Sequence, residues 1–186
     1  MSTIYLIRHG RTEANERHLY CGSSDLPLSQ SGMEALRNKD YDVLPDRFLT
    51  SGMKRTEQTL ELLFGEVPHE IDPRFREVDF GVFELHSYEE LKDDPAYQAW
   101  ITGDNESNVP PNGESGRQMT MRVLEAFRDL EGRGETCVLI AHGGVIAAIM
   151  ASLFPEEGKN RYQWQPKPGE GYVLKDGRYR YINGEA

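Results

Sequence analysis

The chain has 186 residues and a formal net charge of −10 at pH 7, with 31 Asp and Glu against 21 Lys and Arg. This length predicts one domain, residues 1–186, with a full core, and the acidic excess argues against nucleic-acid or anionic-membrane binding, which needs a basic face. No run approaches the ~20 apolar residues of a membrane span, no secretory signal is visible, and Cys21 and Cys137 form no disulfide framework, so we expect a cytoplasmic protein.

Apolar runs and helical periodicity predict strands that alternate with helices along the chain. The predicted strands are short runs of apolar and β-branched residues. One helix is marked by apolar residues at spacings of four, four and three from Met119 to Leu130, and Asp176-Gly177 marks a hairpin turn. We therefore expect an α/β fold with a largely parallel sheet. The predicted strands are 3–7, 47–50 and 136–141, and the predicted helices are 54–63, 117–131 and 145–154.

The stretch 92–116 differs from the rest of the chain. It is rich in Asp, Pro, Asn and Gly around a short helical patch. Long irregular stretches inside compact domains are usually functional or disordered. We expect this one to be a cap or active-site loop, with disorder as the alternative.

His9 and His142 occupy matching places in the predicted pattern. Each follows an apolar strand and precedes glycine, and then a turn or helix. Ligands of open α/β sheets bind at the carboxyl ends of strands, so both histidines are candidates for one crevice. Gly10 and the pair Gly143-Gly144 let the backbone approach a ligand closely, and the helix N-termini that follow favour an anion. Gly143 is therefore a candidate substrate-binding residue.

Two arginines accompany the histidines. Arg8 adjoins His9, and Arg55 lies near the start of a predicted helix. Their forked guanidinium donors suit a phosphate group, as do the hydroxyl of Thr12 and the amide of Asn15. Arginine does not suit a metal cation, which disfavours a zinc site on the two histidines, and the sequence has no H-E-x-x-H motif. We therefore expect a phosphate ester as ligand and no metal.

The structural alternative for each histidine is a capped or partly buried residue, which is the more common case after a strand. Two histidines at equivalent strand ends, with two arginines available, favour catalysis instead. The remaining histidines, His18, His69 and His86, have no such setting.

The sequence around these residues resembles the histidine phosphatase superfamily, the phosphoglycerate mutase-like proteins. The first block carries the signature, and the others follow in the family's order across nearly the whole chain. The resemblance implies a three-layer α/β sandwich with a central, mainly parallel sheet flanked by helices. The blocks are LIRHGRTEAN, GSSDLPLSQSG, TSGMKRTEQT, FREVDFGVFE, NGES and AHGG.

The resemblance also implies roles for the candidate residues. His9 matches the nucleophile that becomes phosphohistidine. Arg8, Arg55 and His142 match the phosphate pocket, with Asn15 as a further contact. On this chemistry we expect a protonated His142 that adds positive charge beside the two arginines, and no cofactor.

Glu77, in FREVDFG, matches the acid that protonates the leaving oxygen and then serves as base for the hydrolytic water. From the residues alone, Glu77 would be interpreted as a surface carboxylate, because glutamate is rarely buried. Its role is therefore implied by the resemblance only.

The spacing of the blocks bears on the reaction. Mutases of this superfamily resemble the chain but carry a longer insertion after the acid block, whereas Gly113 here follows Glu77 by only 36 positions. We therefore predict a hydrolase, most similar to the bacterial branch that includes α-ribazole phosphatase.

Two positions depart from the sequence that is common in that branch. Phe83-Glu84-Leu85 stands where Trp-Glu-Gly is common, and Gly52 stands where an apolar residue is usual. The alternatives are a phosphoglycerate mutase, a non-catalytic phosphate-binding protein and a metal-dependent hydrolase.

Overall fold

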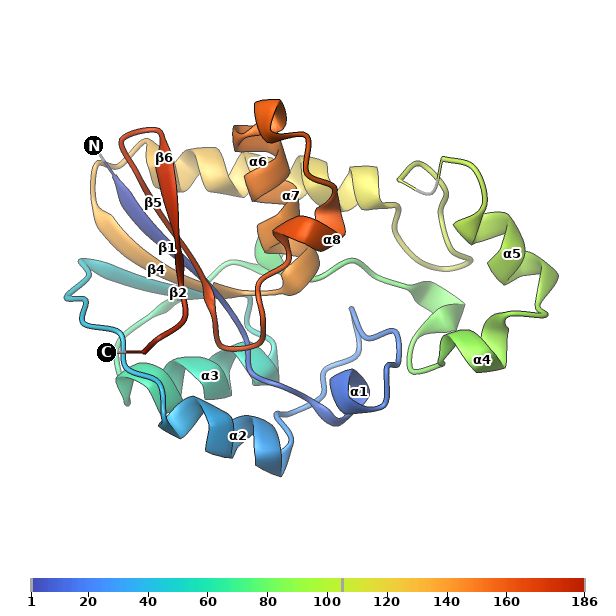
Figure 1. The fold of residues 1–186 in the computed structure, drawn as a ribbon, viewed down its shortest axis with the longest axis horizontal. Coiled ribbons are helices and arrows are strands. Elements are labelled where there is room, and N and C mark those ends of the chain that lie inside the picture. Colours follow the sequence, from blue (N-terminus) through green and yellow to red (C-terminus); the bar gives the residue numbers. More distant parts are fainter. Residues whose placement is uncertain (1, 105, 186) are drawn as a thin grey trace.

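One six-stranded sheet runs through the computed structural model, which describes residues 2–104 and 106–185 (Figure 1). Its strands are β1 (Thr3–Arg8), β2 (Arg47–Thr50), β3 (Glu70–Ile71), β4 (Thr136–Ala141), β5 (Gly171–Lys175) and β6 (Arg178–Ile182). The strand order is β3-β2-β4-β1-β5-β6. The pairs β1–β4, β2–β4 and β2–β3 are parallel, whereas β5 is antiparallel to both β1 and β6. The predicted mainly parallel sheet is thus confirmed.

Helices cover both faces of this sheet. The α-helices of the described residues are α1 (Glu13–Glu16), α2 (Gln30–Arg37), α3 (Lys54–Phe64), α4 (Tyr88–Leu91), α5 (Pro95–Ile101), α6 (Gly116–Glu131), α7 (Gly143–Leu153) and α8 (Arg161–Trp164). In Figure 1, α6 and α7 lie above the sheet and α2 and α3 lie below it. The expected three-layer sandwich is confirmed.

Successive side chains of a central strand point to opposite faces of the sheet, and this divides the hydrophobic core into two parts. Ile4 and Leu6 of β1 pack with the α6 and α7 side, while Ile7 packs with Leu60 of α3 on the other. β4 is buried on both faces except at Thr136. This double burial explains its continuous apolar run, because a parallel strand with helices on both sides has no polar face.

A small lobe holds α4 and α5 and lies apart from the sheet (Figure 1). It has its own aromatic cluster, centred on the buried side chains Phe83, Leu91 and Tyr97. The helical patch predicted within the stretch 92–116 is α5 of this lobe, which begins with Asp94 as its N-cap and Pro95 in the first turn, and the last residue of the stretch, Gly116, begins α6. Asn105 within that stretch lies outside the described residues.

The helix α2 was not predicted from the sequence. Gly32 and Leu36 are its buried residues, so its apolar stripe is too short to show as a period. Gly32 is needed there, because a Cβ would lie 2.2 Å from the carbonyl oxygen of Arg11. The helix α7 begins two residues earlier than predicted, at Gly143. None of the helices in the described ranges is long and apolar enough to cross a membrane.

Candidate active site

His9 and His142 lie side by side at the carboxyl ends of two neighbouring strands. Arg8, the last residue of β1, is in register with Ala141, the last residue of β4. A histidine follows the last residue of each strand, and the ring centroids of His9 and His142 are 5.1 Å apart. His9 is 5% exposed and His142 is fully buried. The two histidines that were predicted to share one crevice therefore lie next to each other in the fold.

The His9 ring is held by its own turn. Its Nδ1 lies 2.6 Å from the carbonyl oxygen of Gly10, and a carbonyl only accepts, so Nδ1 carries the proton and donates. Burial lowers the pKa of His9 well below its ordinary value, and the nearby charges of Arg55 and Arg8 lower it further. His9 is therefore a neutral imidazole with its lone pair on Nε2, the form a nucleophile requires.

The structure contradicts the expectation of a protonated His142. Burial lowers the pKa of His142 well below its ordinary value, and Arg55, His9 and Arg8 lower it further. The sequence could not show this, because the effect depends on burial and on groups that the fold brings to His142 from the end of β1 and from α3. His142 Nε2 lies 2.8 Å from Ser51 Oγ, while its Nδ1 is buried without a hydrogen-bond partner.

Arg55 and Arg8 are fixed by backbone carbonyls rather than by carboxylates. Arg55, which is 1% exposed, donates from Nη1 to the carbonyl of Ser24 (2.8 Å) and from Nη2 to that of Gly22 (2.7 Å). Arg8 donates from Nη1 to the carbonyl of Pro166 (2.8 Å). Carbonyls orient a guanidinium without neutralising it, so both arginines keep their full charge for a ligand.

Unpartnered donors gather in this cluster. Within the described residues, the buried side-chain nitrogens that lack a hydrogen-bond partner are Arg8 Nε, Arg55 Nε, His142 Nδ1 and Trp164 Nε1. Three of these belong to the residues around His9: the Nε–H groups of the two arginines are donors, and His142 Nδ1 is a donor in one of the two tautomers of the neutral ring. An unsatisfied buried donor costs about 1–3 kcal/mol, so two unpartnered arginine donors beside an unpartnered ring nitrogen favour a site that binds an oxyanion. Such a site is cationic although the chain as a whole is acidic.

Glu77 joins the cluster through the backbone of α7. Its Oε2 accepts from the N–H of Gly144 (2.8 Å), and its Oε1 accepts from the N–H of Val78 (3.0 Å). A Cβ on Gly144 would lie 2.4 Å from Glu77 Oε1, and a Cβ on Gly143 would lie 3.1 Å from Arg8 Cζ. The glycine pair therefore makes room for an acid on one side and a cation on the other.

Thr12 and Asn15 lie in the turn that follows His9. They form a capping box for α1, in which Thr12 Oγ1 donates to Asn15 Oδ1 (3.1 Å) and accepts from the backbone N–H of Asn15 (3.3 Å). The hydroxyl proton of Thr12 is used inside this cap. Of the two predicted binding groups, the amide nitrogen of Asn15 is therefore the better placed to meet a ligand.

Sequence reasoning missed the residues that support the cluster. Ser51 contacts His142 across 91 positions, and no local pattern marks such a pair. The carboxylate of Glu84 accepts from the backbone N–H groups of Gly22, Ser23 and Ser24, and so fixes the loop whose carbonyls hold Arg55. Across residues 2–104 and 106–185, no three His, Cys, Asp or Glu side chains are arranged to hold a metal ion.

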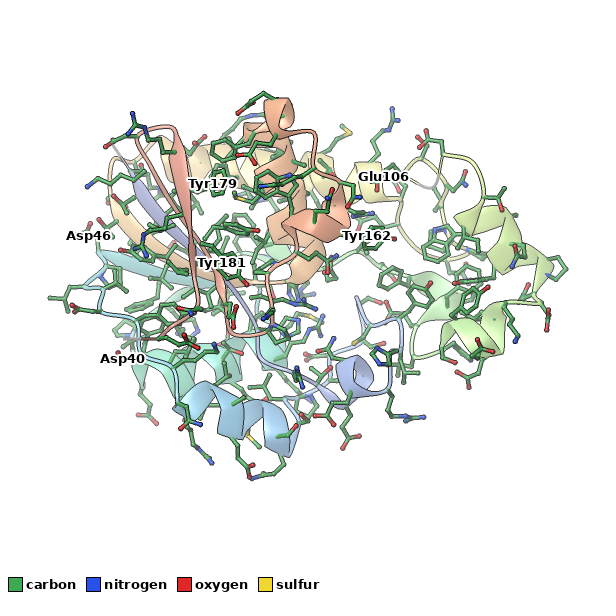
Figure 2. The ribbon with its side chains drawn as sticks, in the orientation of Figure 1. Asp40, Asp46, Glu106, Tyr162, Tyr179 and Tyr181 are labelled. Atoms are coloured by element: carbon green, nitrogen blue, oxygen red, sulfur yellow. The ribbon has the colours of Figure 1, made fainter. Side chains whose placement is uncertain are left out.

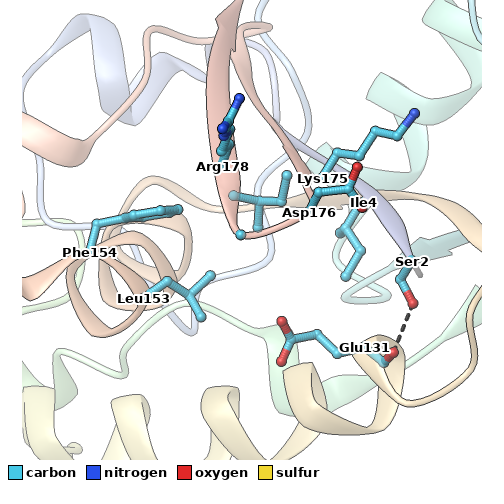
Figure 3. Close-up of a pocket in the computed structure, with 10 residues that line it drawn as sticks. Ser2, Ile4, Glu131, Leu153, Phe154, Lys175, Asp176 and Arg178 are labelled. Carbon is cyan, nitrogen blue, oxygen red and sulfur yellow. Dashed lines mark hydrogen bonds between the residues drawn. The ribbon is translucent and has the colours of Figure 1, made fainter.

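Two cavities differ in their relation to the cluster. One of about 270 Å³ begins at Glu77 and Gly144 and extends to Trp100 of the lobe and Tyr162 of α8. Another of about 450 Å³ lies at the amino end of β1, where Ser2 donates to the carbonyl of Glu131 (Figure 3). None of the candidate catalytic residues lines this second cavity, so only the first continues the site.

Comparison with known proteins gives one consistent family. The model of the histidine phosphatase superfamily (branch 1) matches residues 4–180. The adenosylcobalamin/α-ribazole phosphatase of Salmonella typhimurium is 31% identical over 183 residues, covering 89% of this chain and 86% of its own length.

Solved structures agree with this result. The α-ribazole phosphatase of Shigella flexneri has a TM-score of 0.84 at 28% identity, covering 97% of this chain and 96% of its own. A phosphoglycerate mutase of Thermus thermophilus has a TM-score of 0.75 at 30% identity, covering 99% of this chain and 98% of its own.

Proposed function

Because the chain belongs to the histidine phosphatase superfamily (branch 1), and is therefore an enzyme of the phosphatase or mutase type, we propose that it hydrolyses small-molecule phosphomonoesters through a phosphohistidine on His9. The observation that carries this proposal is the group of buried, unpartnered donors of Arg8, Arg55 and His142 beside a neutral His9. The groups of Arg8, Arg55 and His142 suit the oxygens of a tetrahedral phosphate dianion, and His9 suits the role of nucleophile towards its phosphorus.

In the first step, the lone pair of His9 Nε2 attacks phosphorus and the ester P–O bond breaks. The proton of the Glu77 carboxylic acid passes to the leaving oxygen, which departs as an alcohol. Negative charge in the transition state is spread over three equatorial oxygens. Arg8, Arg55 and the Nδ1–H of His142 supply the donors for those oxygens.

In the second step, water attacks the phosphohistidine and gives a proton to the Glu77 carboxylate. The P–N bond breaks, its electron pair returns to His9 Nε2, and inorganic phosphate is released. Each Glu77 oxygen already accepts one backbone N–H and keeps a second lone pair, so the carboxyl stays oriented in both protonation states.

Turnover of p-nitrophenyl phosphate in EDTA tests the proposal. We expect activity from the wild type, none from His9→Ala, and a loss of about 100-fold or more in kcat from Arg55→Ala, the scale of one oxyanion donor. Lys54→Ala is the matched control, because Lys54 is the exposed neighbour of Arg55 on α3, and should behave as wild type. Full activity in His9→Ala would overturn the mechanism.

The mutase is the second candidate, favoured by the likeness to the Thermus thermophilus phosphoglycerate mutase. A mutase returns the phosphoryl group to its substrate and so releases little phosphate. Phosphorus NMR on 3-phosphoglycerate separates the two reactions: hydrolysis yields inorganic phosphate, whereas a mutase yields 2-phosphoglycerate. The names of the Salmonella and Shigella relatives make α-ribazole phosphate the first metabolite to test.

A further inference from the structure

The NGES segment (Asn112–Ser115) packs against the chain that follows Glu77. The backbone N–H of Glu114 donates to the carbonyl of Asp79 (2.8 Å). A Cβ on Gly113 would lie 2.5 Å from that same carbonyl oxygen, so only glycine fits this close approach. The proposed reaction uses no side chain of this segment, although the segment adjoins the part of the chain that carries the acid.

The side chain of Glu114 binds Arg122 of α6 through both carboxylate oxygens. Arg122 donates from Nε to Glu114 Oε1 (2.7 Å) and from Nη2 to Glu114 Oε2 (2.7 Å). The same guanidinium donates from Nη1 to the carbonyls of Arg74 (2.8 Å) and Arg76 (2.7 Å), and from Nη2 to that of Glu77 (3.2 Å). A guanidinium has five N–H groups, and these five hydrogen bonds use all of them.

The clamp formed by Arg122 and Glu114 holds a stretch of chain without regular structure. Glu77 lies between two short 3₁₀ helices, Pro73–Phe75 and Gly81–Phe83, so no ladder of helix or strand hydrogen bonds fixes its backbone. The carbonyls that Arg122 binds supply this support, because the last of them belongs to Glu77. The backbone of the acid is thus held from α6, while its carboxyl is held from α7.

The helix α6 is a firm base for the clamp. Its N-cap is Ser115, the last residue of the NGES segment. The Ser115 hydroxyl accepts from the backbone N–H of Gln118 (3.1 Å), and Gln118 Oε1 accepts from the N–H of Ser115 (2.9 Å). Glu106, labelled in Figure 2, lies beside the start of α6, and its carbonyl accepts from the N–H of Arg117 (2.9 Å). The clamp therefore joins Glu77 to a helix whose first turn is anchored twice.

The pair of Arg122 and Glu114 is largely shielded from water. The two side chains are 26% and 20% exposed. Exposed ion pairs contribute little to stability, but a half-buried guanidinium with every N–H bonded fixes the position of each partner. Lysine cannot replace it, because an ammonium has three donors and lacks the planar fork. The arrangement thus depends on the shape of arginine and not on its charge alone.

We propose, given the phosphatase function above, that Arg122 and Glu114 are positioning residues for the general acid. They hold the backbone of Glu77 so that its carboxyl lies at the ester oxygen when the P–O bond breaks and the proton passes to that oxygen. A displacement of about 1 Å at a reacting group can cost roughly 100-fold in rate, so the position of this backbone bears directly on catalysis. Because every N–H of Arg122 is already bonded, the pair acts through Glu77 and not on the phosphate.

The test compares phenyl phosphate with p-nitrophenyl phosphate, which have the same ring but different leaving groups. p-Nitrophenolate is the weaker base and departs with little help from an acid, whereas phenolate depends more on the proton of Glu77. The measured quantity is the ratio of kcat/KM for p-nitrophenyl phosphate to kcat/KM for phenyl phosphate, which reports the first step only. Loss of the acid raises this ratio, whereas general damage to the fold lowers both values alike and leaves the ratio unchanged.

We expect Glu77→Gln to raise the ratio by about 100-fold, the lower end for a general acid. Arg122→Lys should raise it by about ten-fold, because the acid is present but displaced, and Glu114→Gln should act in the same direction. The effects should not add in the double variant, since the two side chains form one unit. Arg128→Lys is the matched control, because it is the same exchange at an exposed position of α6, and it should keep the wild-type ratio.

The outcomes separate this proposal from the proposed function. An unchanged ratio in Arg122→Lys, beside a raised ratio in Glu77→Gln, would overturn the clamp as a positioning device and leave the phosphatase function intact. If Arg122→Lys is inactive with both esters, Glu114→Gln decides by the same criterion. An unchanged ratio in Glu77→Gln would refute the acid assignment and the clamp with it, and no turnover of either ester by the wild type would count against the phosphatase function.

Discussion

His9 and His142 show how burial and neighbouring charge set the state of a residue. Both rings are almost fully removed from water, and both face the guanidinium groups of Arg8 and Arg55. Each influence disfavours the imidazolium, so the pKa of each histidine lies well below 6.5 in the folded protein. The positive charge of the site thus comes from arginine alone, while the histidines stay available as nucleophile and neutral donor.

The free energy of unfolding should therefore fall as the pH is lowered below about 6.5. In the unfolded chain both histidines bind protons near pH 6.5, whereas in the folded protein they do not. Stability then decreases with falling pH by at most about 1.4 kcal/mol per pH unit for each histidine. Urea unfolding of phosphate-free protein between pH 7.5 and 5.5 measures the slope.

His69 provides an internal control for that slope. A hydrogen bond to the carbonyl of Val67 and the neighbouring Glu57 raise the pKa of His69, so its contribution has the opposite sign. His69→Gln should make the fall in stability steeper, and His142→Asn should make it shallower. Equal slopes in wild type and His142→Asn would contradict a neutral, buried His142.

Ser51 should fix the tautomer of His142. Ser51 Oγ lies 3.2 Å from Thr56 Oγ1, and Thr56 gives its own hydroxyl proton to the carbonyl of Met53 (2.8 Å). Ser51 can therefore donate its proton either to Thr56, and accept from His142 Nε2–H, or to His142 Nε2. A phosphate site needs an N–H at Nδ1, and Ser51 must then donate to Nε2. We expect nitrogen NMR of the ring to show the Nδ1–H form in wild type and a mixture in Ser51→Ala, with about ten-fold lower kcat/KM, the lower end for an outer-shell partner.

Among the elements, the turn at Leu85 carries the clearest conflict between sequence and backbone. Leu85 has φ +61, a left-handed conformation that costs a residue with a Cβ about 1–2 kcal/mol. The backbone N–H of Leu85 donates to the carbonyl of Tyr20 (2.7 Å), which ties the turn to the loop after α1. The glycine common in the related branch would meet this geometry without strain.

Leu85→Gly should therefore raise the free energy of unfolding by up to about 1 kcal/mol, since the relief of strain exceeds the added freedom of the unfolded chain. Little packing is lost, because Leu85 is 41% exposed. Leu85→Ala keeps the Cβ and should give no gain. Chemical unfolding of the wild type, Leu85→Gly and Leu85→Ala measures these differences in the free energy of unfolding. A Leu85→Gly variant that is less stable than Leu85→Ala would contradict backbone strain at Leu85.

The elements predicted from the sequence are those whose own residues carry the signal. Strands such as β1 and β4 consist mainly of apolar and β-branched residues, and α6 has a full apolar stripe. The helix α2 and the contact of Ser51 with His142 were not predictable, because each depends on partners distant in the chain. The role of Glu77 was implied only by family resemblance, since its link to the cluster is a hydrogen bond from the backbone N–H of Gly144, which lies 67 positions away.

For the molecule as a whole, overall charge and local charge have opposite signs. The chain carries a formal charge of −10, yet its buried cluster presents two arginines without carboxylate partners. Surface charges in water are screened over about 8–10 Å at ordinary ionic strength, whereas Arg55 and the Nε of Arg8 are buried and act on a ligand at short range. The parallel arrangement of β1 and β4 makes this possible, because it brings both histidines and Arg8 to one sheet edge.

An oxyanion should therefore stabilise the whole fold. A ligand that binds only the folded state at 100 times its Kd adds about 2.7 kcal/mol, which for a chain of this size raises Tm by roughly 5–10 °C. We expect inorganic phosphate or vanadate to give such a shift, and chloride at equal ionic strength to give none. Arg55→Ala should lose the shift and Lys54→Ala should keep it. A shift that persists in Arg55→Ala would place the anion elsewhere and remove the main support for the phosphate site.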